Sequence, residues 1–290
     1  MAEPRRLQWA ILARAALTDT AAAQQVWRAH ALDEAVARVL EDPGVFGVPP
    51  TLRQAAADDL DHATEIGARL ITRDDPEWPK DRFTVLAAPQ SSGRDPVALW
   101  ARGPARLDAA VETSIAVIGS RCSTGYGDRV TGELAGDLAA RGWTIISGAA
   151  FGIDGMAHRS ALAVGATTVA VLACGVDRPY PAQHDRLIAQ IADTGLVISE
   201  YPPGVVARKH HFLDRNRLVA ALARGVLVVE AGIRSGSANT VRWAGRFARP
   251  VFAVPGPISS AASTGCHAMI RDGRAQLVTD PQHILDTLTD

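Results

Sequence analysis

The chain has few cysteines and no long apolar run. Its 290 residues include only three cysteines, Cys122, Cys174 and Cys266, which stand far apart. An odd number at such spacing fits neither a disulfide framework nor a metal site, so we expect no bound metal. No stretch of 18 apolar residues occurs and the first residues lack a signal-peptide pattern, so we expect a cytoplasmic protein that does not enter a membrane.

Two common nucleotide-binding motifs are also missing. Residues 119–124 read Gly-Ser-Arg-Cys-Ser-Thr after an apolar run, without the second and third glycines of the dinucleotide fingerprint. The pattern G-x-x-x-x-G-K-[ST] does not occur anywhere, which excludes an ATPase of the Walker type. We therefore expect no cofactor.

The charge is almost balanced overall but unevenly distributed. The formal net charge is −1, yet residues 205–250 hold nine Arg or Lys against two acidic residues. Residues 28–81 hold twelve acidic and six basic residues. A local basic zone in a neutral protein is typical of a polyanion-binding surface, and arginines scattered over solvated helices are the plainer interpretation.

From residue 115 onward, apolar runs alternate regularly with helix-like segments. Runs rich in Val, Ile and Leu, separated by helices, predict a parallel sheet covered on both faces, which is an α/β fold. Ligands of such sheets bind beyond the carboxyl ends of the strands. The predicted strands are 115–118, 143–146, 168–172, 196–198, 226–230 and 250–254, and the predicted helices are 128–141, 153–165, 183–194, 214–224, 236–248 and 263–272.

The first hundred residues have a different pattern. Residues 1–70 are rich in alanine with apolar positions at helical spacing, which predicts a small all-helical domain. Residues 71–106 contain many prolines, and we interpret them as a linker region with one short strand at 97–101. Residues 107–290 then form the sheet domain.

Small and hydroxyl residues recur where the predicted strands end. Gly119-Ser120-Arg121 follows the first strand, and Ser235-Gly236-Ser237 follows the fifth. A small-residue turn between a strand and a helix directs backbone N–H groups and a positive helix end toward one point, which suits a phosphate. The plainer interpretation is a tight connection with a solvated arginine.

Residues 209–217 interleave cations with an aromatic ring. Lys209 and Arg215 provide positive charge, and Phe212 stands between them. A cation holds a phosphate while an aromatic face stacks on a base, so this pattern favours nucleic-acid binding. The alternative is that Phe212 belongs to the core and the cations to the surface.

Acid–base chemistry is a further possibility that the sequence leaves open. Asp154 and His158 stand four residues apart on one predicted helix, and Glu200 and Glu230 end predicted strands. These residues fit a hydrolase. The plainer interpretation is an acidic helix start with a histidine bonded to it, and carboxylates that orient loops or pair with nearby arginines.

The ordered set of strand-end motifs resembles the DNA-processing protein A family (DprA, also called Smf). A looser similarity in the N-terminal part runs through Asp74-x-x-x-Trp78-Pro79 and Leu99-x-x-x-Gly103. The closer matches are Gly119-Ser120-Arg121, Ser147-Gly148-x-Ala150-x-Gly152-Ile153-Asp154 with His158, Tyr180-Pro181, Ser199-Glu200, His211-Phe212 with Arg215-Asn216-Arg217, Val229-Glu230-Ala231, Ser235-Gly236-Ser237 and Pro255-Gly256.

The resemblance implies a fold and a function. It implies an extended Rossmann-like sheet preceded by a small SAM-like helical domain, and a homodimer that binds single-stranded DNA without catalysing a reaction. Family members protect DNA during natural transformation and recombination and help to load the recombinase RecA. Many carry a C-terminal winged-helix domain. This chain ends at Asp290, so we expect that domain to be absent from it.

The resemblance also assigns site residues. A dimer contact is implied at Ile270 and Leu277. The residues implied in strand binding are Gly119, Ser120, Arg121, Gly148, Lys209, Phe212, Arg215, Asn216, Ser235, Gly236 and Ser237.

The alternative function is a Rossmann-like nucleotide hydrolase or sensor, similar to phosphoribohydrolases. Those proteins carry a Pro-Gly-Gly-x-Gly-Thr turn and a catalytic Arg-Glu pair. The comparable turn here, residues 235–240, lacks that pattern. The chain also departs from the DprA pattern, with Leu213 in place of a proline and His184 in place of an asparagine.

Overall fold

The computed structural model describes residues 4–18, 20–87 and 95–289, which form a nine-stranded sheet with helices around it. The strands are β1 (Ala68–Thr72), β2 (Ala98–Arg102), β3 (Ser114–Ile118), β4 (Thr144–Ser147), β5 (Thr168–Val171), β6 (Leu196–Ser199), β7 (Gly225–Val228), β8 (Val251–Ala253) and β9 (Gln276–Leu277). The helices are α1 (Arg5–Thr18), α2 (Thr20–Ala29), α3 (Leu32–Glu41), α4 (Leu52–Glu65), α5 (Lys80–Ala87), α6 (Leu107–Glu112), α7 (Gly125–Ala140), α8 (Ile153–Ala163), α9 (Asp185–Thr194), α10 (Lys209–Leu222), α11 (Ser237–Arg246), α12 (Thr264–Arg271) and α13 (Pro281–Thr289).

The six strands and six helices predicted after residue 115 are all present. The strand order is β1-β2-β6-β5-β4-β3-β7-β8-β9, and every neighbouring pair from β6 to β9 is parallel. One boundary differs by five residues: α10 begins at Lys209, where we expected a loop up to residue 213. The charged and aromatic residues at its start hide the apolar periodicity that marks the rest of the helix.

A correction concerns residues 71–106, which we interpreted as a linker. The predicted strand is present as β2, but it pairs antiparallel with β6 and with β1, so this segment completes one edge of the main sheet. The predicted boundary at residue 70 falls inside β1, and α5 follows. The prolines stand before elements, Pro79 before α5 and Pro96 before β2, where proline is tolerated. Residues 88–94 lie outside the described part.

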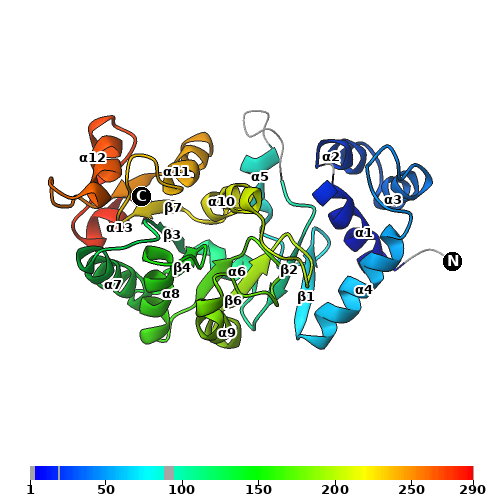
Figure 1. Cartoon of the computed structure of the whole chain (residues 1–290), viewed down its shortest axis with the longest axis horizontal. Helices are drawn as coiled ribbons and strands as arrows, with labels where there is room; N and C mark the ends of the chain where they lie inside the picture. The colour runs from blue at the N-terminus through cyan, green and yellow to red at the C-terminus, as the bar shows by residue number, and fades with distance from the viewer. Residues whose placement is uncertain (1–3, 19, 88–94, 290) are drawn as a thin grey trace.

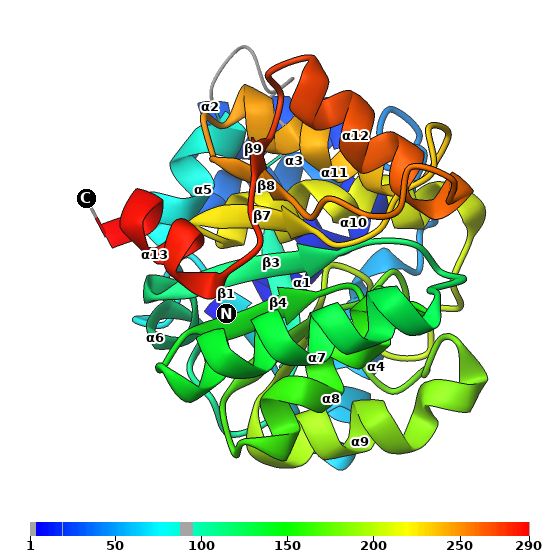
Figure 2. The ribbon, with the colours of Figure 1, turned by 90° about the vertical axis from the view of Figure 1, so that its left-hand side faces the viewer.

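Alternate residues of each strand face two different helical layers. On β3, Ile115 and Val117 pack in a core with α7, α8 and α13, whereas Ala116 and Ile118 pack in a core with α5, α6, α10, α11 and α12. This alternation is the period of two that strand geometry imposes. Figures 1 and 2 show the sheet between these two layers, with α12 and α13 at the end far from the N-terminal helices.

The four helices α1 to α4 pack together at the β1 and β2 end of the sheet (Figure 1). Trp100 of β2 and Leu70 of β1 join the core formed by these helices. The buried carboxylate of Asp95 accepts hydrogen bonds from Arg28 and Arg73 and so ties α2 to the start of β2. None of the described helices is long and apolar enough to cross a membrane.

The chain reverses its direction of sheet growth at β3. From β3 it builds outward through β4, β5 and β6, and it then returns through α10 to place β7 on the other side of β3. The two connections diverge at this point and leave a crevice beyond the carboxyl ends of β3 and β7. Such a switch point is where open α/β sheets bind ligands.

Candidate nucleic-acid interface

A groove with a volume of about 720 Å³ opens at the switch point. All eleven residues assigned to strand binding from the sequence line it, so the structure brings the predicted set together. They come from the ends of β3 and β4, from α10 and from the start of α11. Their role in binding DNA stays a prediction.

The turn after β3 is held in place by its own backbone contacts. The Ser120 hydroxyl accepts from the N–H of Cys122 and donates to its carbonyl oxygen, at 3.1 and 3.0 Å. A Cβ on Gly119 would lie 2.5 Å from Cγ1 of Ile153 and 2.9 Å from the carbonyl oxygen of Glu230. Glycine is therefore required there by packing, and Arg121 is left exposed at the groove.

The start of α7 does not offer the phosphate site that the sequence predicted. Glu230 accepts hydrogen bonds from the N–H and the hydroxyl of Thr124, the N-cap residue, at 2.9 and 2.6 Å. A Cβ on Gly127 would lie 2.2 Å from the same carboxylate. A protein carboxylate thus already occupies the positive end of this helix, which also answers the open question about Glu230.

The start of α11 is the more open helix end at the groove. Its N-cap residue, Gly236, provides no side-chain cap. The hydroxyl oxygen of Ser235 is buried and has no hydrogen-bond partner, while Ser237 donates to the Gly119 carbonyl oxygen at 3.1 Å. An uncapped helix start beside an unpaired hydroxyl can bind an anion through the remaining N–H groups and the helix dipole.

The other wall of the groove carries an aromatic pair and cations. The rings of Phe212 and Tyr180 lie 5.0 Å apart between centroids, and the Arg121 guanidinium lies 5.1 Å from the Phe212 centroid. Lys209 is exposed one turn before Phe212 on α10. Tyr180 was absent from the predicted site, although its Tyr-Pro motif pointed to it. A half-buried ring flanked by cations is suited to stacking on a base.

Arg215, one of the residues assigned to strand binding from the sequence, has an unexpected position in the groove. Its side chain is buried beneath the groove, where one Nη donates to the Val171 carbonyl oxygen and Nε has no partner. A Cβ on Gly148 would lie 2.1 Å from this guanidinium. Burial lowers the pKa of Arg215, and the nearby carboxylate of Asp154 opposes that shift. Arg215 therefore shapes the floor of the groove and gives it positive potential.

The basic zone is not one continuous surface. Of its nine cations, Arg208, Lys209 and Arg215 line the groove. Arg217 is buried in a bidentate ion pair with Glu200, with both N–O distances 2.6 Å. Arg224 lies at the opposite rim of the sheet. The excess of positive charge seen in the sequence is thus divided among separate structural roles.

Asp154 stands in the first turn of α8, as the interpretation of an acidic helix start expected, but it does not contact His158. Asp154 accepts from the N–H of Gly148 at 3.2 Å, and His158 Nδ1 contacts the hydroxyl of Thr168 at 2.7 Å. Burial lowers the pKa of His158 to about 3, so this ring is neutral at physiological pH. The two residues support the sheet on either side of α8.

The two residues assigned to a dimer contact lie on the same face at one end of the sheet. Leu277 is on β9, the last strand in the order, and is 47% exposed. It pairs with Ala253, which belongs to the core layer that also contains α12, where Ile270 is partly buried. The neighbouring Met269 and Val278 are buried, so the accessible apolar area is smaller than the sequence indicated.

Replacing Gly119 by alanine should destabilise the protein by about 1–3 kcal/mol, because the added methyl group overlaps Ile153 and the Glu230 carbonyl oxygen. Gly236→Ala is the matched control in the same groove, since its Cβ would meet nothing within 4 Å, and it should stay within about 0.5 kcal/mol of wild type. Chemical denaturation measures both. Equal stability of the two variants would contradict the packing requirement at Gly119.

The sequence is similar to a family model and to known bacterial proteins. A family model described as DNA recombination-mediator protein A matches residues 69–289. The chain is 52% identical over 235 residues to the putative DNA processing protein DprA of Mycobacterium tuberculosis, covering 80% of this chain and 60% of that protein. It is 44% identical over 194 residues to protein Smf of Escherichia coli, covering 67% of this chain and 51% of that protein. The chain thus spans between about half and three fifths of these relatives.

Two solved structures share the fold along much of the chain. The X-ray structure of DNA processing protein A from Streptococcus pneumoniae has a TM-score of 0.75 at 31% identity and covers 99% of both chains. A DNA processing protein A from Helicobacter pylori has a TM-score of 0.66 at 32% identity, covering 76% of this chain and 96% of the other. The Helicobacter structure was described as giving insight into a unique mode of single-stranded DNA binding.

Proposed function

Because the chain belongs to the DNA recombination-mediator protein A family, we propose that it binds single-stranded DNA in the groove between β3 and β7. The observation that carries the proposal is the composition of this groove. An aromatic pair, exposed cations and an uncapped helix start face one space. These are the two elements, a phosphate-holding surface and a stacking surface, that sequence-tolerant strand binding needs.

The stacking surface favours a single strand over a duplex. Phe212 is half-buried and sits in the wall of the groove with Tyr180. Bases of a duplex are stacked on each other and cannot present a free face to such a ring, whereas bases of a single strand can be splayed onto it. The phosphates of the same strand would then follow Lys209, Arg121 and the start of α11.

The role of the bound strand follows from the family. We propose that the protein protects single-stranded DNA during natural transformation and recombination and helps RecA to load onto it, without catalysing a reaction. A groove that holds phosphates and stacks bases leaves other parts of the strand accessible, which suits transfer to a second protein. A homodimer through the β9 end would carry two such grooves.

The hydrolase alternative receives little support from the described residues. Glu230 is engaged in capping α7, and Glu200 is held by both nitrogens of Arg217. A general base must be free to reach a substrate proton, and these two carboxylates are already committed. Incubation with a panel of nucleoside monophosphates tests the alternative directly. Release of free base by the wild type, lost on mutation of a groove residue, would favour it.

Binding of single-stranded DNA should fall steeply with salt. Three cations at the groove surface, Arg121, Arg208 and Lys209, predict a slope of log K against log salt of roughly −2, at about −0.7 per neutralised phosphate. Titrating labelled oligonucleotides of several sequences, single-stranded and duplex, at four or more salt concentrations measures it. Equal affinity for duplex, or binding that does not change with salt, would contradict the proposal.

A further inference from the structure

A second and larger pocket, of about 960 Å³, lies at the opposite rim of the sheet. Three arginines from different parts of the chain line it: Arg82 from α5, Arg224 just before β7 and Arg249 just before β8. The residues before parallel strands meet at the amino edge of a sheet, so this pocket is on the far side from the groove. The groove and its strand-binding role do not account for these arginines.

In the described part of the chain, none of the three guanidinium groups forms an ion pair with an acidic side chain. Arg82 donates to the carbonyl oxygens of Val111 and Glu112, at 2.9 Å each. Arg249 donates one long hydrogen bond, 3.4 Å, to the carbonyl oxygen of Ala221, and its Nε is buried without a partner. Within residues 4–18, 20–87 and 95–289, no carboxylate lies within 4 Å of Arg82, Arg224 or Arg249.

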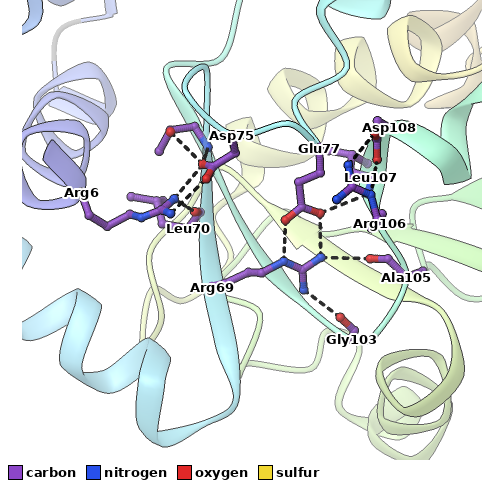
Figure 3. A network of polar contacts seen from close by, with 11 residues as sticks. Arg6, Arg69, Leu70, Asp75, Glu77, Gly103, Ala105, Arg106, Leu107 and Asp108 are labelled. Carbon is purple, nitrogen blue, oxygen red and sulfur yellow. Dashed lines mark hydrogen bonds and ion pairs between the residues drawn. The ribbon is translucent and has the colours of Figure 1, made fainter.

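The acidic residues around this pocket are largely committed to other cations (Figure 3). Arg6 binds both oxygens of Asp75, which also accepts from the N–H and hydroxyl of Thr72. Arg106 binds Asp108 in the same bidentate manner. Asp81 and Glu112 are exposed at the rim and solvated. Asp81 and Glu112 only partly offset the charge of Arg82, and among the described residues none of the three arginines has an ion pair with a carboxylate.

Burial and the repulsion between these arginines both act on Arg82. Burial, followed by the charges of Arg249 and Arg224, lowers the pKa of Arg82 to about 10. A like-charge cluster that is partly removed from water costs free energy unless an anion neutralises it. Holding three arginines together against this cost is the physical signature of a site built for a multivalent oxyanion.

We propose that Arg82, Arg224 and Arg249 form a second anion site that binds a phosphate group. Guanidinium groups match phosphate oxygens in bidentate geometry, and a dianion balances the cluster better than chloride. The pocket offers no stacking surface for a base, because Trp78 and Phe83 are buried against each other with centroids 4.9 Å apart. The site therefore recognises the phosphate, which a nucleotide or the end of a DNA strand can supply.

Thermal unfolding at constant ionic strength tests the site on the full chain. Inorganic phosphate and pyrophosphate, exchanged for chloride, should raise Tm in a concentration-dependent manner, because a ligand of the folded state stabilises it. Arg224→Gln and Arg249→Gln should each weaken the apparent affinity by roughly tenfold or more. Two variants are used because Arg249 also contacts Ala221, so a folding defect in one leaves the other informative.

Two controls separate this site from the groove. Arg246→Gln removes an exposed arginine from α11 that lines neither pocket, and Lys209→Ala removes a groove cation. Arg246→Gln should keep the phosphate response of the wild type, and Lys209→Ala should keep the part of that response that Arg224→Gln and Arg249→Gln remove. If phosphate and chloride give the same Tm, or if Lys209→Ala abolishes the response while Arg224→Gln keeps it, the proposal is overturned.

The source of the phosphate is distinguished by the probe. A nucleoside monophosphate and a short oligonucleotide with a 5′-phosphate are compared, each against its form without phosphate. If one of these two compounds loses binding when its phosphate is removed and also when Arg224 is replaced by Gln, that compound is the natural source of the phosphate. Binding that ignores the phosphate in both arms would contradict the site even if DNA binding in the groove is intact.

Discussion

Phe212→Ala should weaken single-stranded DNA binding by about 1–3 kcal/mol, or roughly 5- to 150-fold, with little change in the salt slope. The ring contacts Tyr180 and the guanidinium of Arg121 at the wall of the groove, so its removal takes away the stacking surface and leaves the cations in place. Stacking releases few counterions, so the affinity should fall while the dependence of the affinity on salt stays nearly the same. Fluorescence anisotropy at several salt concentrations measures both quantities.

The next residue on the same helix gives a matched control. Leu213 also lines the groove and is 51% exposed, but it has no aromatic face. Leu213→Ala should therefore change affinity far less than Phe212→Ala. Chemical denaturation of both variants separates binding from folding. A Phe212→Ala protein that unfolds would show that the ring serves the core, and equal losses in the two variants would reject stacking.

Lys209 and Arg121 should behave differently from Phe212 and from each other. Lys209→Ala should weaken all sequences alike and make the salt slope shallower by about one phosphate contact. Arg121 lies over the Phe212 ring, so its removal disturbs both charge and stacking. The double variant Arg121→Ala with Phe212→Ala should then lose less affinity than the sum of the single losses, because the two side chains are in contact.

The parallel part of the sheet could be predicted because its strands are continuous apolar runs. Residues 115–118 and 250–254 were expected as strands and appear as β3 and β8, each buried on both faces. Of the antiparallel edge, β2 was expected at 97–101, but β1 was not, because it follows α4 almost without a break. β9, the parallel strand at the other edge of the sheet, has two residues, too few for any periodic signal.

The residues of the site that stand directly after parallel strands could be predicted from the sequence. Turns after parallel strands meet at one rim, which is why Gly119 and Ser235 face the same groove. Burial of a charge could not be predicted, because it depends on tertiary packing. Arg215 is buried only because Gly148 leaves room for its guanidinium, and Arg217 because Glu200 stands opposite.

The same rule of strand polarity explains the arginines that do not line the groove. Arg224 stands directly before β7 and Arg249 two residues before β8, so the strand topology places both at the amino edge. Counting charge over residues 205–250 merged the two rims into one basic zone. Assigning each cation to the start or the end of its nearest strand would have separated them. It would also have shown that the chain carries positive charge at both edges of one sheet.

Leu277→Glu should convert the proposed homodimer into folded monomers and weaken binding to long strands far more than to short ones. Leu277 is half-exposed on β9, where the sheet order ends, and it lies on the same face as Ile270 of α12. A charge buried in a self-complementary contact is costly, because it loses contact with water and gains no partner. Ile270→Glu should act in the same direction but also disturb the core that Ile270 partly joins.

Loss of the dimer changes affinity through effective concentration. A long strand can occupy both grooves of a dimer, which can raise its apparent affinity by roughly 10²-fold or more over one groove, whereas a strand too short to reach both gains nothing.

Gln276→Glu is the matched control, because it adds the same charge on β9 where the side chain faces α13 and already accepts from Thr287. Light scattering and binding to both lengths measure the outcome. A contact through the face of Leu277 predicts that a charge at residue 277 breaks the dimer and that the same charge at residue 276, on the opposite face, does not. Leu277 is not at the interface if the wild type is a monomer or if binding to short and long DNA falls equally. The same conclusion follows if Gln276→Glu also gives monomers.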